Sequence, residues 1–171
     1  GLVGSEMCIR DSLSTDLISD TAGTEDKIVY TGDDRLVLNN FAGNNGIDII
    51  DANGEEIVGN SGNNNFDFQN VTFEDNNQVI QGGHGTDTIR GGSGNEVIQG
   101  GFGADHLYGN AGADRLEGDD GADRLFGGGH NDVLIGGKHD DYLEGGAGRD
   151  RLEGGTENDH LRGGEGRDTL V

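Results

Sequence analysis

The feature that most constrains this chain is a nine-residue period that runs without interruption from residue 82 to residue 171. Within it, the stretch GGHGTDTIRGGSGNEVIQGGFGADHLY contains three consecutive copies of the unit. Ten nonapeptides follow one another with no insertion or deletion. A short fixed period indicates a repeat architecture, in which each unit buries its apolar side chain only by stacking on its neighbours.

Three columns of the repeat keep one residue type in every copy. The first position is always glycine: Gly82, Gly91, Gly100, Gly109, Gly118, Gly127, Gly136, Gly145, Gly154 and Gly163. The sixth is always an acid: Asp87, Glu96, Asp105, Asp114, Asp123, Asp132, Asp141, Asp150, Asp159 and Asp168. The eighth is always Ile or Leu: Ile89, Ile98, Leu107, Leu116, Leu125, Leu134, Leu143, Leu152, Leu161 and Leu170. The second and fourth positions are mostly glycine, with Asn110, Asp119, His130, His139 and Glu157 as the exceptions.

These columns predict a short strand followed by a tight turn in every repeat. A three-residue strand such as 88–90 alternates its side chains, so the eighth-position aliphatic points inward and its neighbours point outward. Glycine accepts positive φ without a steric penalty, and this permits the chain to reverse within the six residues before each strand. Glycine carbonyls and aspartate carboxylates are hard oxygen donors, which suit Ca²⁺ rather than zinc or copper.

The pattern G-G-x-G-x-D-x-U-x resembles the RTX, or hemolysin-type, calcium-binding repeat over all of residues 82–171. The resemblance implies an all-β fold, a right-handed parallel β-roll or β-solenoid with two nonapeptides in each coil. It also implies Ca²⁺ ions between stacked turns, held by the ten sixth-position carboxylates and by main-chain carbonyls. The carbonyls that we expect to take part are those of Gly82, Gly83, Gly100, Gly101, Gly118, Gly127, Gly136, Gly145, Gly154 and Gly163.

If two repeats form a coil, five turns on each edge leave four gaps, or roughly eight slots in all. We expect the best slots at the pairs Asp87/Asp105 and Asp150/Asp168, which have complete glycine turns. The extra methylene of Glu96 should misplace its oxygens relative to Asp114. Weaker slots are expected where a fourth-position glycine is replaced, at His130, His139 and Glu157.

The overall composition limits the classes of partner. The formal net charge of −22 argues against nucleic acid and anionic membranes, which are bound by basic surfaces. Low hydrophobicity with high charge would on its own allow disorder, and the strict repeat is what argues for a fold. No apolar run approaches the roughly 18 residues that span a bilayer. We therefore expect no transmembrane segment.

Residues 1–12 differ in character from the rest. Val3 to Asp11 is the codon-by-codon translation of a sequencing-library transposon adapter, and we interpret residues 1–12 as an artefact outside the fold. The only cysteine and the only methionine, Cys8 and Met7, lie in this segment. We therefore expect no disulfide framework and no thiolate metal site in the natural chain.

Residues 13–81 show a weaker version of the same organisation. The segments 43–51 and 59–67 fit the template loosely, with Asp48 and Asn64 at the sixth position. Apolar residues recur at spacings of seven or nine: Ile50, Ile57, Phe66, Phe73, Ile80 and Ile89. DKIVY and DDRLVL are predicted to form strands, and SLSTDLIS a short cap. The region is predicted to be a degenerate β-solenoid or capping region, with a separate small β-domain as the alternative.

The sequence contains no recognisable catalytic constellation. It lacks an HExxH motif, a G-x-S-x-G elbow and a phosphate-binding loop, and its five histidines are best read as solvated side chains. The leading hypothesis is a non-enzymatic, calcium-folded β-roll. By resemblance, it would be the folding and export module of a larger secreted protein, with the parent chain and the type I secretion apparatus as partners. The alternatives are a fragment of a secreted hydrolase or an adhesin whose functional domain is mostly missing.

Overall fold

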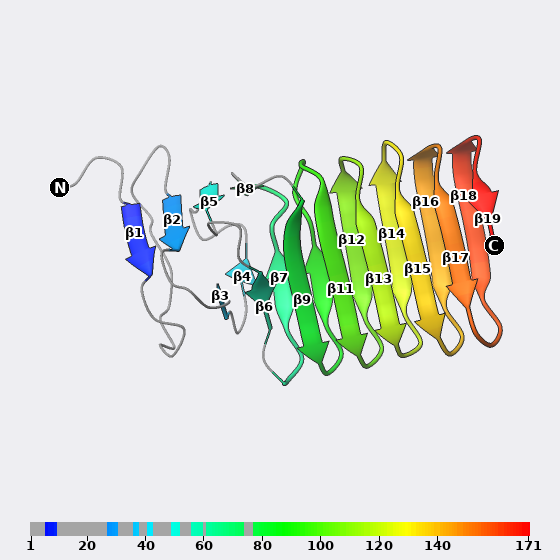
Figure 1. Ribbon diagram of the computed structural model, residues 1–171, viewed down its shortest axis with the longest axis horizontal. Helices are drawn as coiled ribbons and strands as arrows, with labels where there is room; N and C mark the ends of the chain where they lie inside the picture. Colours follow the sequence, from blue (N-terminus) through cyan, green and yellow to red (C-terminus); the bar gives the residue numbers. More distant parts are fainter. Residues whose placement is uncertain are drawn as a thin grey trace.

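The chain forms an all-β solenoid in a computed structural model (Figure 1). The structure describes the backbone of strands at 6–9, 27–30, 36–37, 41–42 and 49–51, and residues 56–59, 61–73 and 77–171 in full. Every strand pair among these residues is parallel. In this part of the chain no helix is long and apolar enough to cross a bilayer.

Two sheets face each other along the repeats. The eight-stranded sheet contains β3 (Leu36–Val37), β6 (Ile57–Val58), β9 (Gln78–His84), β11 (Glu96–Phe102), β13 (Arg115–Asp120), β15 (Val133–Lys138), β17 (Arg151–Gly155) and β19 (Thr169–Leu170). The seven-stranded sheet contains β4 (Phe41–Ala42), β7 (Asn65–Asp67), β10 (Thr88–Arg90), β12 (His106–Ala111), β14 (Arg124–Gly129), β16 (Tyr142–Gly148) and β18 (His160–Gly166). From β9 onward, successive strands alternate between the two sheets, and this alternation builds the coils of the roll.

The register confirms two nonapeptides in each coil. Ile89 pairs with Leu107 on the seven-stranded sheet, and Ile98 pairs with Leu116 on the eight-stranded sheet, so each partner lies eighteen residues along the chain. Most strands are longer than the three residues predicted, because the glycine turns also pair between coils, as Gly128 does with Gly146. The expected positive φ is found at His130, His139 and Glu157.

Within the repeats, the core consists of the eighth-position side chains that the two sheets direct inward. Ile89, Ile98 and the leucines from Leu107 to Leu152 are fully buried, whereas Leu170 in the last strand is 50% exposed. Outward-facing side chains form ladders along the sheets. The rings of Tyr108 and Phe126 stack at 5.0 Å on the seven-stranded sheet. On the other sheet Arg115 contacts Glu117 and Arg151 contacts Glu153, as the alternation predicts.

The coils before residue 80 contain three strands rather than two. A third sheet contains β1 (Glu6–Ile9), β2 (Lys27–Tyr30), β5 (Ile49–Asp51) and β8 (Thr72–Phe73). Ile57 pairs with Ile80, and Phe66 pairs with Ile89, so one coil takes 23 residues. The observed spacings of nine and seven therefore separate successive strands of a three-sided coil. The eight- and seven-stranded sheets run through from these coils into the repeats.

Some expectations for the first 81 residues meet the structure only in part. The strands predicted in DKIVY and DDRLVL are present as β2 and β3. The predicted cap in SLSTDLIS and the carboxylate Asp48 lie outside the described residues. Strand β1 lies inside residues 1–12, which we expected to stand apart from the fold, and it pairs with β2. An open sheet edge offers unpaired backbone groups to any short extended segment, whatever its origin.

Candidate metal centre

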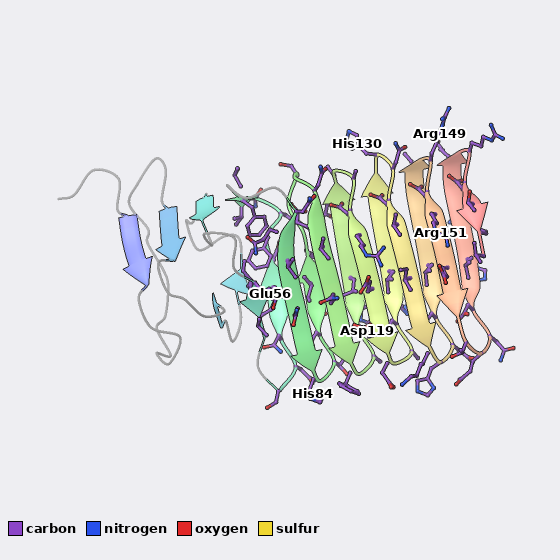
Figure 2. All side chains as sticks on the ribbon, viewed as in Figure 1. Glu56, His84, Asp119, His130, Arg149 and Arg151 are labelled. Carbon is purple, nitrogen blue, oxygen red and sulfur yellow. The ribbon has the colours of Figure 1, made fainter. Side chains whose placement is uncertain are left out.

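The acidic residues of the repeats lie in two rows, one along each edge of the roll where the glycine turns join the sheets. One row, the Asp87 row, is the set Asp87, Asp105, Asp123, Asp141 and Asp159. The other, the Asp114 row, is the set Glu96, Asp114, Asp132, Asp150 and Asp168. In Figure 2, His84 marks the turns of the Asp87 row, and His130 and Arg149 mark those of the Asp114 row. The repeat thus gathers acids that are far apart in sequence.

One oxygen of each aspartate ties two coils together. The backbone N–H of Asp87 donates to Oδ1 of Asp105 at 2.7 Å, and the N–H of Asp105 donates to Oδ1 of Asp123 at 2.7 Å. The Asp114 row repeats the arrangement, with the N–H of Asp114 donating to Oδ1 of Asp132 at 2.9 Å. Corresponding bonds of 2.8–3.1 Å continue to Asp141, Asp150, Asp159 and Asp168. A short carboxylate at the sixth position is therefore part of the stacking itself.

The second oxygen of these carboxylates has no such partner. Among the described residues, Oδ2 is buried without a hydrogen bond in Asp87, Asp105, Asp114, Asp123, Asp132, Asp141 and Asp150. A buried anionic oxygen without a donor is costly, and native structures contain few of them. Each of these atoms marks a position where a positively charged partner would lower the free energy of the folded chain.

The first-position glycine forms the floor of the space beside each Oδ2. A methyl group at Gly100 would overlap Oδ2 of Asp105 and lie 2.9 Å from the carbonyl oxygen of Gly118 in the next coil. We call this unit a cradle: a bare glycine, the carboxylate of its own repeat, and the carbonyl of the glycine eighteen residues on. Complete cradles in the described residues begin at Gly82, Gly91, Gly100, Gly109, Gly118, Gly127, Gly136 and Gly145.

Burial changes the acidity of the rows. It raises the pKa to about 6 for Asp105 and Asp141, and to about 7 for Asp114, Asp123 and Asp132. Hydrogen bonds from backbone N–H groups lower the pKa in part, and neighbouring acids of the same row raise it further. Burial also raises the pKa of Asp87, Glu96 and Asp150. The fold therefore disfavours the charged form of these groups when no cation is beside them.

Glu96 departs from the aspartate geometry in the manner that its length suggests. Its Oε2 accepts a hydrogen bond from the N–H of Gly92, in its own turn, at 3.0 Å. The aspartates instead accept from a neighbouring coil. The backbone N–H of Glu96 still donates to Oδ1 of Asp114 at 2.9 Å, so the next link of the row is intact. Glutamate thus keeps the stacking and moves only its own carboxylate.

The expected carbonyl ligands other than that of Gly101 divide into two groups. The carbonyls of Gly100, Gly118, Gly127, Gly136, Gly145, Gly154 and Gly163 each face a first-position glycine and its carboxylate, as does that of Gly109, which the sequence reasoning omitted. The carbonyl of Gly82 faces Asn64 instead of an acid, and the carbonyl of Gly83 lies against the Cα side of Gly101. No carbonyl closes the cradles of Asp159 and Asp168 within the described residues.

Fifth-position side chains reinforce the turns, and the sequence reasoning missed them. Oδ1 of Asn95 accepts from the N–H of Ala113 at 2.8 Å, and Oδ1 of Asn131 accepts from the N–H of Arg149 at 2.8 Å. Oδ1 of Asp140 does the same for the N–H of Asn158 at 2.9 Å. The available signal was the recurrence of short amide or acid side chains beside a turn, where they commonly bond to backbone.

The chemistry of the donor set is that of a hard cation. In the described part of the chain, no three side chains of histidine, cysteine, aspartate or glutamate come together to hold a metal. A cation in a cradle would therefore depend on main-chain carbonyls together with one or two carboxylates, which is a common ligand set for Ca²⁺. The buried, unpaired Oδ2 atoms and the bare glycine floors fit such an ion.

Comparison with known proteins gives one match. The family model described as RTX calcium-binding nonapeptide repeat (4 copies) matches residues 74–107, 90–125, 108–143, 117–152 and 135–170. No curated protein and no solved structure matches the chain.

Proposed function

The chain belongs to the RTX calcium-binding nonapeptide repeat family, and from this premise we propose that its roll binds Ca²⁺ in the cradles along both rows. The observation that supports this most directly is the series of buried Oδ2 atoms without donors. Each lies beside the carbonyl of a glycine in the next coil. A bound cation would supply the positive charge that these oxygens lack.

The residues that would hold the ions are the sixth-position carboxylates and the facing first-position carbonyls. We propose that the aspartates from Asp87 to Asp150 form the well-framed positions, because each has a complete cradle. Glu96 would contribute less, because its carboxylate is bonded within its own turn.

Calcium would also drive the folding of the repeats. Carboxylates stacked near the strand spacing of about 4.8 Å repel one another by about 1 kcal/mol per pair in water and several-fold more near a protein surface. The core adds only one aliphatic side chain for each repeat, so little apolar burial opposes this repulsion. A divalent cation between the coils turns repulsion into attraction, and its binding free energy becomes folding free energy.

The biological role that we propose is a folding and export module of a larger secreted protein. The family resemblance supports this role, because a chain that folds only in calcium stays unfolded where calcium is scarce and orders where calcium is abundant. The roll would contribute no chemistry of its own. Any activity would belong to the parent chain.

The test is the number of ions bound by the intact chain. Equilibrium dialysis against Ca²⁺ should saturate at up to eight ions, one for each complete cradle. Mg²⁺ should not replace Ca²⁺, because it is smaller and gives up its water reluctantly. The substitution Asp132→Asn should remove at least one ion, whereas the matched change Asp140→Asn, at an exposed fifth position, should remove none. An absence of Ca²⁺ binding at millimolar concentration would refute the proposal.

A further inference from the structure

The coil that precedes the acidic rows contains a cradle with an amide in place of the carboxylate. Gly59 provides the floor, because a methyl group there would overlap the carbonyl oxygen of Gly82 and lie 2.8 Å from Nδ2 of Asn64. Gly82, Asp87 and Gly100 have the same arrangement one coil later. Asn64 therefore occupies the place that an aspartate has in the following cradles.

Asn64 is only 2% exposed, and its amide nitrogen faces acceptors. Nδ2 lies 2.5 Å from the carbonyl oxygen of Gly62, 3.1 Å from Oδ1 of Asp87 and 3.4 Å from the carbonyl oxygen of Gly82. Carbonyl oxygens and an ionised carboxylate only accept hydrogen bonds, so the NH₂ group of the amide and not its oxygen must face them. The backbone N–H of Asn64 also donates to Oδ1 of Asp87, at 2.6 Å.

We propose that Asn64 closes this cradle without a metal, so that the calcium-binding series begins at Asp87 and the coil of residues 57–73 is a metal-independent cap on the acidic rows. The amide N–H groups stand where a cation would otherwise meet the carbonyl of Gly82. The inference rests on the proposed calcium binding of the later cradles. It names Asn64 as the residue that limits the series on its N-terminal side.

The packing of the cap supplies what calcium supplies elsewhere. Ile57, Phe66, Phe68 and Val71 are all buried within this one coil. The ring centroids of Phe66 and Phe68 lie 5.9 Å apart, and those of Phe68 and Phe73 lie 5.2 Å apart. Aromatic side chains bury far more apolar area than the single leucine of a later repeat. Hydrophobic burial can therefore order this coil when the acidic coils cannot order themselves.

The direct test is Asn64→Asp in the intact chain, with Asn63→Asp as the matched control. Asn63 is exposed at the neighbouring fifth position, and its Oδ1 accepts from the N–H of Thr86 at 2.9 Å, a bond that aspartate can keep. We expect Asn64→Asp to bind one more Ca²⁺ than the parent chain and Asn63→Asp to bind the same number. An unchanged number of ions in Asn64→Asp would overturn the inference.

Hydrogen exchange in chelator provides a second readout that does not depend on ion counting. Peptides covering 57–73 should stay protected in the parent chain, whereas those covering 100–168 should exchange freely. Asn64→Asp should lose the protection of 57–73 in chelator, by about tenfold or more, and regain it in Ca²⁺. Equal exchange in the cap and in the later repeats of the parent chain would contradict a metal-independent cap.

The opposite substitution, Asp87→Asn, tests the same inference if Asn64→Asp does not fold. Asp87→Asn would place an amide in the next cradle, so it should bind at least one ion fewer and extend the chelator-resistant region by one turn. A loss of protection in Asp87→Asn would count against the inference. If the parent chain binds no Ca²⁺ at all, the proposed function fails; if it binds Ca²⁺ and these variants do not behave as stated, only the cap fails.

Discussion

Oδ1 of Asp123 accepts a hydrogen bond from the backbone N–H of Asp105 at 2.7 Å, across eighteen residues of sequence. Oδ2 of the same carboxylate is buried and receives no hydrogen bond from the described residues. One half of the side chain therefore holds two coils together, and the other half faces the carbonyl of Gly136 over the bare Gly118. This division of labour within one carboxylate is repeated along both rows and underlies the predictions below.

Filling one cradle should remove ion binding without destroying the turn. A methyl group at Gly100 would overlap Oδ2 of Asp105, and the carboxylate must move away to accommodate it. The backbone of Gly100 does not have positive φ, so alanine adds no backbone strain, and the cost of the substitution comes from displacing the carboxylate and the Gly118 carbonyl. We predict that Gly100→Ala binds at least one Ca²⁺ fewer, measured by equilibrium dialysis. Gly129→Ala is the control, because a methyl group there meets only one atom, at 3.9 Å, and the number of ions should not change.

The metal-free roll should be more stable in mild acid than at neutral pH. Folding raises the pKa of Asp105 to about 6 and of Asp123 to about 7, mainly through burial, from an ordinary value of 3.8. A raised carboxyl pKa contributes stability that is complete below the unfolded value and is lost as the pH rises through the folded value. Stability should therefore fall between about pH 4 and about pH 7.

Far-ultraviolet circular dichroism in calcium-free buffer at about pH 5 and about pH 7.5 compares the folded fraction of the repeats, and we expect the larger β-sheet signal at the lower pH. The lower pH stays above the isoelectric point near 4.2, where association would interfere. In the presence of Ca²⁺ the trend should reverse, because the ion requires ionised carboxylates. Metal-free stability that is equal at both pH values, or higher at the upper one, would be inconsistent with the buried rows.

A glycine at position 157 should stabilise the roll. Glu157 is exposed and has a φ of 81°, which costs a non-glycine residue about 1–2 kcal/mol. Glycine loses about 0.5–1 kcal/mol of this gain through its greater freedom in the unfolded chain. We predict a net gain of about 0.5–1 kcal/mol for Glu157→Gly, measured by denaturant unfolding in saturating Ca²⁺.

Glu153→Gly provides the matched comparison. Glu153 lies in strand β17, and its substitution removes one negative charge, as Glu157→Gly does. It should destabilise the roll by about 0.5–1 kcal/mol, since glycine weakens a strand. If both variants changed stability in the same direction, backbone strain at Glu157 would not be the cause.

The repeat made most of the roll predictable from sequence. Because the period is nine, pairing over eighteen residues places Leu107 beside Leu125 and Asp105 beside Asp123, and both relationships follow from the columns alone. Positive φ at His139 was predictable for the same reason, since a glycine stands there in most other copies. Because every repeat has the same length, the pairing of two repeats fixes the pairing of all the others. The strand register of the roll could therefore be predicted from the sequence.

The features that sequence reasoning missed depend on contacts between coils. Spacings of nine and seven around Phe66 and Phe73 did not reveal a three-sided coil, because they do not specify which sheet each strand joins. The use of Oδ1 for a backbone bond is a tertiary detail that no column can show. Asn64 resembled a weak sixth-position residue, whereas its amide nitrogen donates to three acceptors, and these contacts support the proposal that it takes the place of a metal.

The central claim is that the acidic rows cannot stack closely until a divalent cation neutralises them. Far-ultraviolet circular dichroism of the intact chain, first in chelator and then during titration with Ca²⁺ at neutral pH, tests it most directly, with Mg²⁺ at equal ionic strength as the control. We predict that the β-sheet signal of the repeats appears cooperatively with Ca²⁺, does not appear with Mg²⁺, and is lost again when chelator is added. A full β-sheet spectrum in chelator that Ca²⁺ does not change would contradict the account.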